Sequence, residues 1–349
     1  MIALSSLAVM VAAIYLLSVV TDGFFIPSLD RIATRWRMPA DVAGASLMAM
    51  GSSAPELSIA LFALFGDGGA HSDVGIGTIV GSAVFNILII TGFSAMVREA
   101  RITLPAIVRD TVFYLVSILV LLVVFWDGRI TVPEGLLFVT IYVVYLGFLF
   151  LVPLGAPALP AAEEAAAVHT PETSSFARLT RTVGRGVGWL AGDPEQAYLR
   201  AFGVSVAFII VLSKLLVDMA LLFSDAVGLP PVVVALTLLA GGTSAPDLIA
   251  SMVVARQGRG SMAVANAIGS NIFDILVGLG LPWLIAMLFL GRPDIAVGTG
   301  DLMLSVVILM GTVLVLFGFL YTDRTLSRRE GVCLVGLYLL YVGWTVAVG

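Results

Sequence analysis

The chain has 349 residues, of which 60% are hydrophobic and only 12% are charged, with a formal net charge of -5. Soluble domains carry about 25% charged residues, so this composition, with a mean hydropathy of +1.09, excludes an ordinary water-soluble fold. The single cysteine, Cys333, excludes an internal disulfide and a metal cluster built on cysteines.

Apolar runs recur along the chain at about 20 residues, the length that spans a bilayer as a helix. Strand-like alternation is absent, so the sequence predicts an all-α membrane protein. Five transmembrane helices are expected in each half of the chain. In chain order they cover residues 2–28, 39–65, 74–97, 106–126, 134–153, 200–224, 229–255, 262–290, 299–320 and 331–348.

One long connection, residues 154–199, separates the two halves. It opens with PALPAAEEAAAV, which is predicted to be disordered, and continues with FARLTRTVGRGVGWL. In the second stretch apolar residues recur at helical spacing with arginines between them. That pattern fits a helix lying on an anionic membrane surface, but three glycines weaken the helix, and a plain polar linker remains an equal alternative.

The basic residues predict how the chain is oriented. All but three of the 18 fall in the odd-numbered gaps between predicted helices, and the exceptions are Arg129, Arg292 and Lys214. Basic loops stay in the cytoplasm, so we expect a multi-pass protein of the cell (inner or plasma) membrane with both termini extracytoplasmic. Because five is odd, the second half enters the membrane from the opposite side. The prediction is two inverted five-helix repeats, 1–153 and 200–349, joined by the cytoplasmic linker 154–199.

Two pairs of motifs repeat between the halves. GSSAPEL at 51–57 matches GTSAPDL at 242–248, and GSAVFNIL at 81–88 matches GSNIFDIL at 269–276, which indicates a duplicated two-helix unit. Within each motif, oxygen-bearing side chains lie three or four residues apart and so share a helix face. The proline before each acid removes a backbone donor, which is predicted to disrupt the helix and free carbonyl oxygens one turn earlier.

The motifs predict a pocket of oxygen ligands inside the membrane. Carboxylate, hydroxyl, amide and carbonyl oxygens suit hard cations such as Ca²⁺, whereas zinc or copper would favour His or Cys. Acids left empty in a membrane are very costly, so cations or protons must occupy the pocket at all times, which gives a physical reason for exchange. The predicted ligands are Glu56, Asp247, Asp274, Asn86, Ser52, Ser53, Ser82, Thr243, Ser244 and Ser270.

Two other features of the predicted helices have local interpretations. Lys214 and Asp218 are four residues apart and are predicted to pair with each other. Asp22 on the first helix is interpreted as a residue of a cavity or of its cytoplasmic mouth.

The repeated motifs resemble the two α-repeats of the cation/Ca²⁺ exchanger superfamily, and the match is best to the potassium-dependent sodium/calcium exchangers. It extends through FFIPSLDRIATRWRMPADVAGASLMAMGSSAPE and SAPDLIASMVVARQGRGSMAVANAIGSNIFDILVGLGLPW. The resemblance implies ions bound between the second, third, seventh and eighth helices, with Glu56 and Asp247 as central Ca²⁺ and Na⁺ ligands. It also implies a link between Asp274 and K⁺. Ser52 departs from that branch, which often has Gly there.

The predicted function is secondary active antiport of Na⁺ for Ca²⁺ by alternating access, with K⁺ carried together with Ca²⁺. The alternative is a Ca²⁺/H⁺ or potassium-independent Na⁺/Ca²⁺ exchanger. An intramembrane aspartyl protease using Asp247 and Asp274 would leave Glu56 and the repeat unexplained. We therefore expect no enzyme activity and no cofactor. The expected partners are the three ions and the lipid bilayer, without nucleic acid or a required protein partner.

Overall fold

The computed structural model describes residues 1–37, 49–66, 71–101, 104–151, 175–256, 258 and 260–348. Within these residues the chain is helical apart from two short pairs of strands and the connecting turns. Eight helices are long and apolar enough to cross a membrane, and a ninth crossing results if one bent helix pair counts as a single span. The chain is an all-α membrane protein, as the composition predicts.

The first half begins with a long helix that contains one π-helical turn and extends to Arg35, beyond the predicted end at residue 28. The predicted helix 39–65 is described only from Ala49, because residues 38–48 lie outside the described part. The elements are α1 (Ile2–Val20), η1 (Thr21–Phe25), α2 (Ile26–Arg35), α4 (Ala49–Ser52), α5 (Ala54–Phe65), α6 (Ser72–Phe85), η4 (Asn86–Ile90), α7 (Thr91–Val97), α8 (Leu104–Val124) and α9 (Val132–Leu151).

The second half follows the predicted order, with ends that differ by a few residues. Its first helix stops at Gly228, whose φ of 77° is a left-handed conformation that glycine adopts without strain. The elements are α12 (Tyr198–Val227), α13 (Pro231–Val234), η5 (Ala235–Leu239), α14 (Ala240–Thr243), α15 (Ala245–Arg256), α16 (Gly260–Phe273), η6 (Asp274–Leu279), α17 (Gly280–Phe289), α18 (Thr299–Asp323) and α19 (Arg328–Val348).

Part of the linker is a helix, α11 (Ser175–Ala191), as one of the two interpretations of that segment predicts. Val187 and Ala191 are buried, and the hydroxyls of Tyr15 and Thr180 lie 2.7 Å apart. The helix is therefore docked on the first helix of the chain. The stretch PALPAAEEAAAV lies outside the described residues, and the contact of α11 with an anionic membrane stays a prediction.

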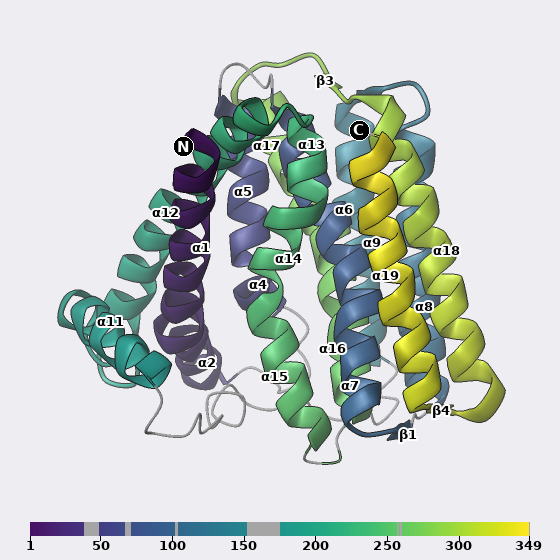
Figure 1. Cartoon of the computed structure of the whole chain (residues 1–349), viewed down its shortest axis with the longest axis horizontal. Coiled ribbons are helices and arrows are strands. Elements are labelled where there is room, and N and C mark those ends of the chain that lie inside the picture. The colour runs from purple at the N-terminus through teal and green to yellow at the C-terminus, as the bar shows by residue number, and fades with distance from the viewer. Residues whose placement is uncertain are drawn as a thin grey trace.

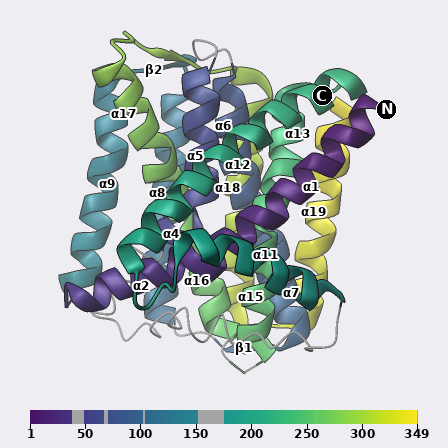
Figure 2. The same cartoon turned by 90° about the vertical axis from the view of Figure 1, so that its left-hand side faces the viewer.

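The buried apolar residues form two clusters. One joins α1, α11 and α12 to one side of α5 and of the α13–η5 segment, and the other fills the space between α6, α8, α16 and α18. Figure 1 shows α1, α11 and α12 together at the left and α8, α18 and α19 at the right, with α4, α5, α14 and α15 between them. Figure 2 shows that α1 and α12 run obliquely across that side of the molecule.

Two small antiparallel sheets join the halves of the chain. The strand β1 (Ala100–Arg101) pairs with β4 (Thr325–Leu326), and β2 (Arg129–Ile130) pairs with β3 (Ile295–Ala296). Figure 1 shows β1 and β4 at the bottom and β3 at the top, so the two sheets close opposite ends of the molecule.

The two spans that carry the second motif pair, Ser72–Val97 and Ala263–Phe289, are the most enclosed of the eight candidate spans in the described part of the chain. The best apolar window of residues 72–97 is buried over 100% of its length, against 22% for the first helix. Close packing there depends on Gly81 of α6, where an added Cβ would overlap the carbonyl oxygen of Leu236 and lie 2.8 Å from the Cβ of Ala240. Glycine at this position therefore allows α6 and the segment 235–243 to approach closely.

We expect Gly81→Ala to destabilise the protein by about 1–3 kcal/mol, because the new methyl group forces α6 away from the segment 235–243. Gly311→Ala on α18 is the matched control, since nothing lies within 4 Å of a Cβ at that position. Thermal unfolding of both variants in detergent measures the difference. Equal midpoints for the two variants would contradict the proposed close contact.

Candidate cation site

Both copies of the proline motif interrupt a helix at the same place. The first break is at Ser53, with φ of -92° and ψ of 6°, and the second is at Ser244, with φ of -86° and ψ of -3°. The second copy bends the helix by 40°. The predicted disruption by proline is therefore confirmed in both motifs. One detail is different, because the Ala240 carbonyl still accepts the backbone N–H of Ser244 at 3.2 Å and is not freed.

Each break places an acid at the start of a new helix. Glu56 lies in the first turn of α5 and Asp247 in the first turn of α15. The amide groups of a first helical turn carry partial positive charge, which favours an ionised carboxylate at these positions. Glu56 is only 2% exposed, and the hydroxyls of Thr243 and Ser244 lie within hydrogen-bonding reach of its carboxyl.

The second motif pair also forms a matched structure. Asn86 begins the π-helical turn η4, and Asp274 begins the π-helical turn η6. Such turns are rare and occur frequently at functional sites, because the extra residue displaces side chains from the regular helical rows. Both side chains are 2% exposed, and the Ser53 hydroxyl lies within hydrogen-bonding reach of Asp274.

A buried hydrogen bond connects the two repeats directly. The Oγ atoms of Ser82 on α6 and Ser244 at the second break are 2.7 Å apart. Eight of the ten predicted ligands are buried, namely Ser53, Glu56, Ser82, Asn86, Thr243, Ser244, Ser270 and Asp274.

Asn271 is a buried residue of this region that the sequence analysis missed. Its carbonyl oxygen accepts the side-chain N–H of Asn86 at 2.8 Å, and its own amide donates to the Ala83 carbonyl at 3.1 Å and to the Tyr114 hydroxyl at 2.9 Å. Its position in the sequence could have indicated it, because Asn271 directly follows Ser270, whereas Ala83 stands at the matching position of the first repeat. Since Asn86 uses its nitrogen in this network, its carbonyl oxygen remains available.

Three oxygen atoms of the predicted ligands are buried without a hydrogen-bond partner among the described residues. They are Oε2 of Glu56, Oδ1 of Asn86 and Oδ1 of Asp274. The other unpartnered atoms are all hydroxyls, which can rotate and donate, whereas carboxylate and amide oxygens only accept. Burying an acceptor without a donor costs several kcal/mol in an apolar medium, so these three atoms require an external positive charge or a donor.

The remaining predicted residues are placed differently. Ser270 is buried, but its hydroxyl donates back to the carbonyls of Asn266 and Ala267 on its own helix, and no described contact joins it to the other ligands. Ser52 and Asp247 are partly exposed within the protein and line a cavity. The local pair expected elsewhere is confirmed, with Lys214 Nζ 2.9 Å from Asp218 Oδ2.

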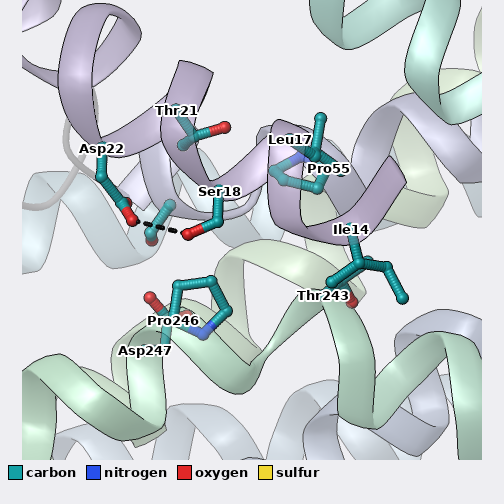
Figure 3. A pocket seen from close by; sticks show the side chains of 10 residues that line it. Ile14, Leu17, Ser18, Thr21, Asp22, Pro55, Thr243, Pro246 and Asp247 are labelled. Atoms are coloured by element: carbon teal, nitrogen blue, oxygen red, sulfur yellow. Dashed lines mark hydrogen bonds between the residues drawn. The ribbon is translucent and has the colours of Figure 1, made fainter. Parts of the chain in front are cut away.

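That cavity lies between the first helix and the two breaks. Its walls are formed by Ile14 to Asp22 on one side and by Ser52, Pro55 and the turn Thr243–Asp247 on the other. Figure 3 shows Ser18 and Asp22 on the first helix facing Pro246 and Asp247 across this space. The space open to water-sized molecules is about 20 Å³, enough for about one water molecule or one ion.

Acidic side chains alone do not complete a metal site in the described part of the chain. No three His, Cys, Asp or Glu side chains there lie close enough together to hold a metal ion. Glu56 interacts electrostatically with both Asp247 and Asp274. A cation in this region must therefore be held by a mixture of carboxylate, amide and hydroxyl oxygens, which is the ligand set of hard cations.

Comparison with known proteins agrees with this chemistry. The family model described as "Sodium/calcium exchanger protein" matches residues 5–151 and 198–347. Human sodium/potassium/calcium exchanger 4 is 28% identical, over 96% of this chain and 79% of its own length. Human sodium/potassium/calcium exchanger 5 is also 28% identical, over 93% of this chain and 79% of its own length.

The fold is also similar to solved structures of the sodium-calcium exchanger NCX_Mj. The form soaked with Na⁺ and Sr²⁺ has a TM-score of 0.58 at 22% identity, and the match covers 98% of this chain and 99% of that one. The form soaked with zero Na⁺ and Ca²⁺ has a TM-score of 0.56 at 21% identity, with 98% of both chains covered. At this identity the likeness concerns the fold.

We expect Asn271→Leu to destabilise the protein by about 1–3 kcal/mol, because it removes the side-chain partner of the Asn86 amide and of the Tyr114 hydroxyl in the interior. It should also reduce the increase in melting temperature that Ca²⁺ gives, since Asn86 is then free to turn its oxygen away. The control is Asn266→Leu, the same change at a half-buried position of the same helix. Thermal unfolding with and without Ca²⁺ measures both effects, and identical behaviour of the two variants would refute the orienting role of Asn271.

Proposed function

The chain belongs to the sodium/calcium exchanger protein family, a family of antiporters, and we propose that it exchanges Na⁺ for Ca²⁺ by alternating access. The proposal depends on one observation above all others. Glu56, Asn86 and Asp274 each bury one oxygen atom that has no hydrogen-bond partner among the described residues. Cations supply the missing positive charge, and only cations that are released again can be transported.

We propose that all ten ligands predicted from the motifs take part in binding. Glu56 and Asp247 supply charge from the two helix breaks, and Thr243, Ser244 and Ser53 surround the carboxylates with hydroxyls. Ca²⁺ takes six to eight oxygen ligands in flexible geometry, which a mixed set of this kind can provide. Na⁺ competes for the same oxygens, so occupancy by one ion excludes the other. The remaining ligands are Ser52, Ser82, Asn86, Ser270 and Asp274.

We further propose ten membrane spans arranged as two inverted repeats, residues 1–153 and 200–349, with the linker 154–199 between them. The two small sheets support this arrangement. Exchanging the halves converts the pairing of β1 with β4 into the pairing of β3 with β2, and the sheets lie at opposite ends of the molecule (Figure 1). The matched breaks at Ser53 and Ser244 support it as well.

Both termini lie at the same end of the molecule in the two views (Figures 1 and 2), as an even number of spans requires. The basic residues favour the cytoplasm for the other end. We therefore propose a location in the cell (inner or plasma) membrane with extracytoplasmic termini and a cytoplasmic linker.

The alternation of access is proposed to involve α1 and α12. These helices pack with α11 in one apolar cluster, which also reaches one side of α5 and of the α13–η5 segment, while α16 and most of α6 belong to the second cluster. A shift of α1 and α12 would therefore slide along that shared face and leave the second core packed. Because empty acids are costly in a membrane, the shift is expected in loaded states.

K⁺ is proposed to travel with Ca²⁺ and to depend on Asp274. The relatives named sodium/potassium/calcium exchangers support this idea, as does the asymmetry between the repeats, which places Asn86 opposite Asp274. An additional carboxylate can balance one more monovalent cation. The alternative functions are potassium-independent Na⁺/Ca²⁺ exchange and Ca²⁺/H⁺ exchange.

The first test is Ca²⁺ flux in proteoliposomes driven by a Na⁺ gradient. Wild type should exchange the ions, and Glu56→Gln should fall to the level of protein-free liposomes, because the substitution removes the charge but keeps the shape. Asp218→Asn, a carboxylate paired with Lys214 on the surface of α12, is the matched control and should retain exchange. Flux that responds to a pH gradient but not to Na⁺ would favour the Ca²⁺/H⁺ alternative.

The second test addresses potassium. Asp274→Asn should retain Na⁺-dependent Ca²⁺ flux but lose its stimulation by K⁺, since asparagine at this position reproduces the residue of the other repeat. The measurement compares initial rates with and without K⁺ on the Ca²⁺ side. If wild-type flux already ignores K⁺, the potassium proposal is wrong while the exchange proposal stands.

A further inference from the structure

The cavity beside the first helix contains more oxygen atoms than the ligand set explains. Six of its lining residues carry side-chain oxygens, and three of them, Ser18, Thr21 and Asp22, belong to the first helix, outside both repeated motifs. We propose that these three residues and Asp247 form a second Ca²⁺ site, named here the first-helix site, which a cation occupies before it moves to Glu56 and Asp274. This inference rests on the proposed exchange function.

The charges of the cavity favour a cation over any other occupant. Asp22 and Asp247 lie on opposite walls (Figure 3) and interact with each other electrostatically. Ser18 donates a hydrogen bond to Asp22 Oδ2 at 3.0 Å, which fixes the carboxylate at the wall of the cavity. Two ionised carboxylates that face a small common space repel each other, and a cation between them removes that repulsion.

Thr21 supplies an independent observation. Its side chain is 5% exposed and lines the cavity, and its Oγ1 atom has no hydrogen-bond partner among the described residues. A buried threonine in a helix commonly bonds to the carbonyl one turn earlier, so an oxygen left without that bond at a cavity wall is available to a ligand. Thr21 and Asp22 also begin the π-helical turn η1, the kind of irregularity that re-aims side chains.

The size and exposure of the first-helix site fit a Ca²⁺ ion that passes from the protein surface to the proposed inner site. The cavity has room for about one ion or water, and Asp22 is exposed, so the outer end of the cavity lies at the protein surface. Asp247 is partly exposed to this space and also interacts with Glu56. One carboxylate is thus common to the first-helix site and to the proposed inner site, which provides a continuous route for the ion.

A cation at this position would also connect two parts of the protein. Asp22 belongs to the first helix, and Asp247 belongs to the bent segment that carries the second proline motif. An ion between them holds the first helix against the helix breaks. Departure of the ion leaves the two carboxylates to repel each other, which favours separation of the helix from the breaks. The position of the first helix would then depend on whether Ca²⁺ has entered.

Equilibrium dialysis of the purified full chain against ⁴⁵Ca²⁺, without Na⁺, tests the site directly. Wild type should bind two Ca²⁺ ions per chain, one more weakly than the other. Asp22→Asn should lose the weaker ion and keep the tighter one, whereas Glu56→Gln should lose the tighter ion and keep the weaker one. Asp218→Asn should bind as wild type does. Equal binding by wild type and Asp22→Asn would overturn the proposal.

Transport gives a second readout on the same variants. Removal of one ligand charge should raise the apparent KM for Ca²⁺ about tenfold, while the maximal rate changes less than about twofold. An unchanged KM would count against the site even if the protein transports normally. If wild type exchanges no Ca²⁺ for Na⁺, the proposed function fails, but dialysis still decides whether the first-helix site exists.

Folding must be separated from binding in this experiment. Each variant is used only if it elutes as one symmetric peak in size-exclusion chromatography. If Asp22→Asn does not, Thr21→Val replaces it, because valine keeps the shape of threonine and removes only the unpartnered oxygen. Loss or weakening of the second Ca²⁺ in Thr21→Val supports the site, and an unaltered binding curve refutes it.

Discussion

The structure depends on the burial of acceptor oxygens that the protein itself leaves without donors. Glu56 and Asp274 are each 2% exposed, and each keeps one carboxylate oxygen free of hydrogen bonds to described residues. No ion pair among the described residues involves either acid. Such an arrangement is very unfavourable in a membrane without a counter-charge, so these two acids need either a bound cation or a proton.

The rest of the core keeps those oxygens in place. Asn271 occupies the Asn86 nitrogen, and the bond between Ser82 and Ser244 joins the two repeats. Gly81 lets α6 approach the backbone of the segment 235–239 closely enough for these bonds to form. The donor groups of these polar residues are therefore bonded within the protein, whereas some of their acceptor oxygens are not. A cation site needs such unpaired acceptor oxygens.

The two helix breaks could be predicted from the sequence, because proline disrupts helical hydrogen bonding locally. A missing N–H breaks the helical bonding in any context, so the interruptions at Ser53 and Ser244 followed from the motifs alone. The role of Asn271 could not be found in this way. The first repeat has Ala83 at the matching position, and the partner Tyr114 lies on α8, far from Asn271 in the sequence. The hydroxyl of Ser270 illustrates another limit. Sequence spacing does not reveal that its proton bonds back to its own helix, which leaves only the lone pairs of the oxygen for a cation.

The departures from symmetry between the repeats carry as much information as the symmetry. A perfect duplication would give Asn at both π-helical turns and leave two acids, Glu56 and Asp247, at the breaks. Replacement of one Asn by Asp274 adds a third charge, which in a low-dielectric interior repels the other two. The neighbouring Asn271 bonds to the Ala83 backbone of the opposite repeat, so the same motif that adds the charge also ties its helix to the other half. An extra negative charge on a helix tied in this way is balanced either by one more cation or by a proton.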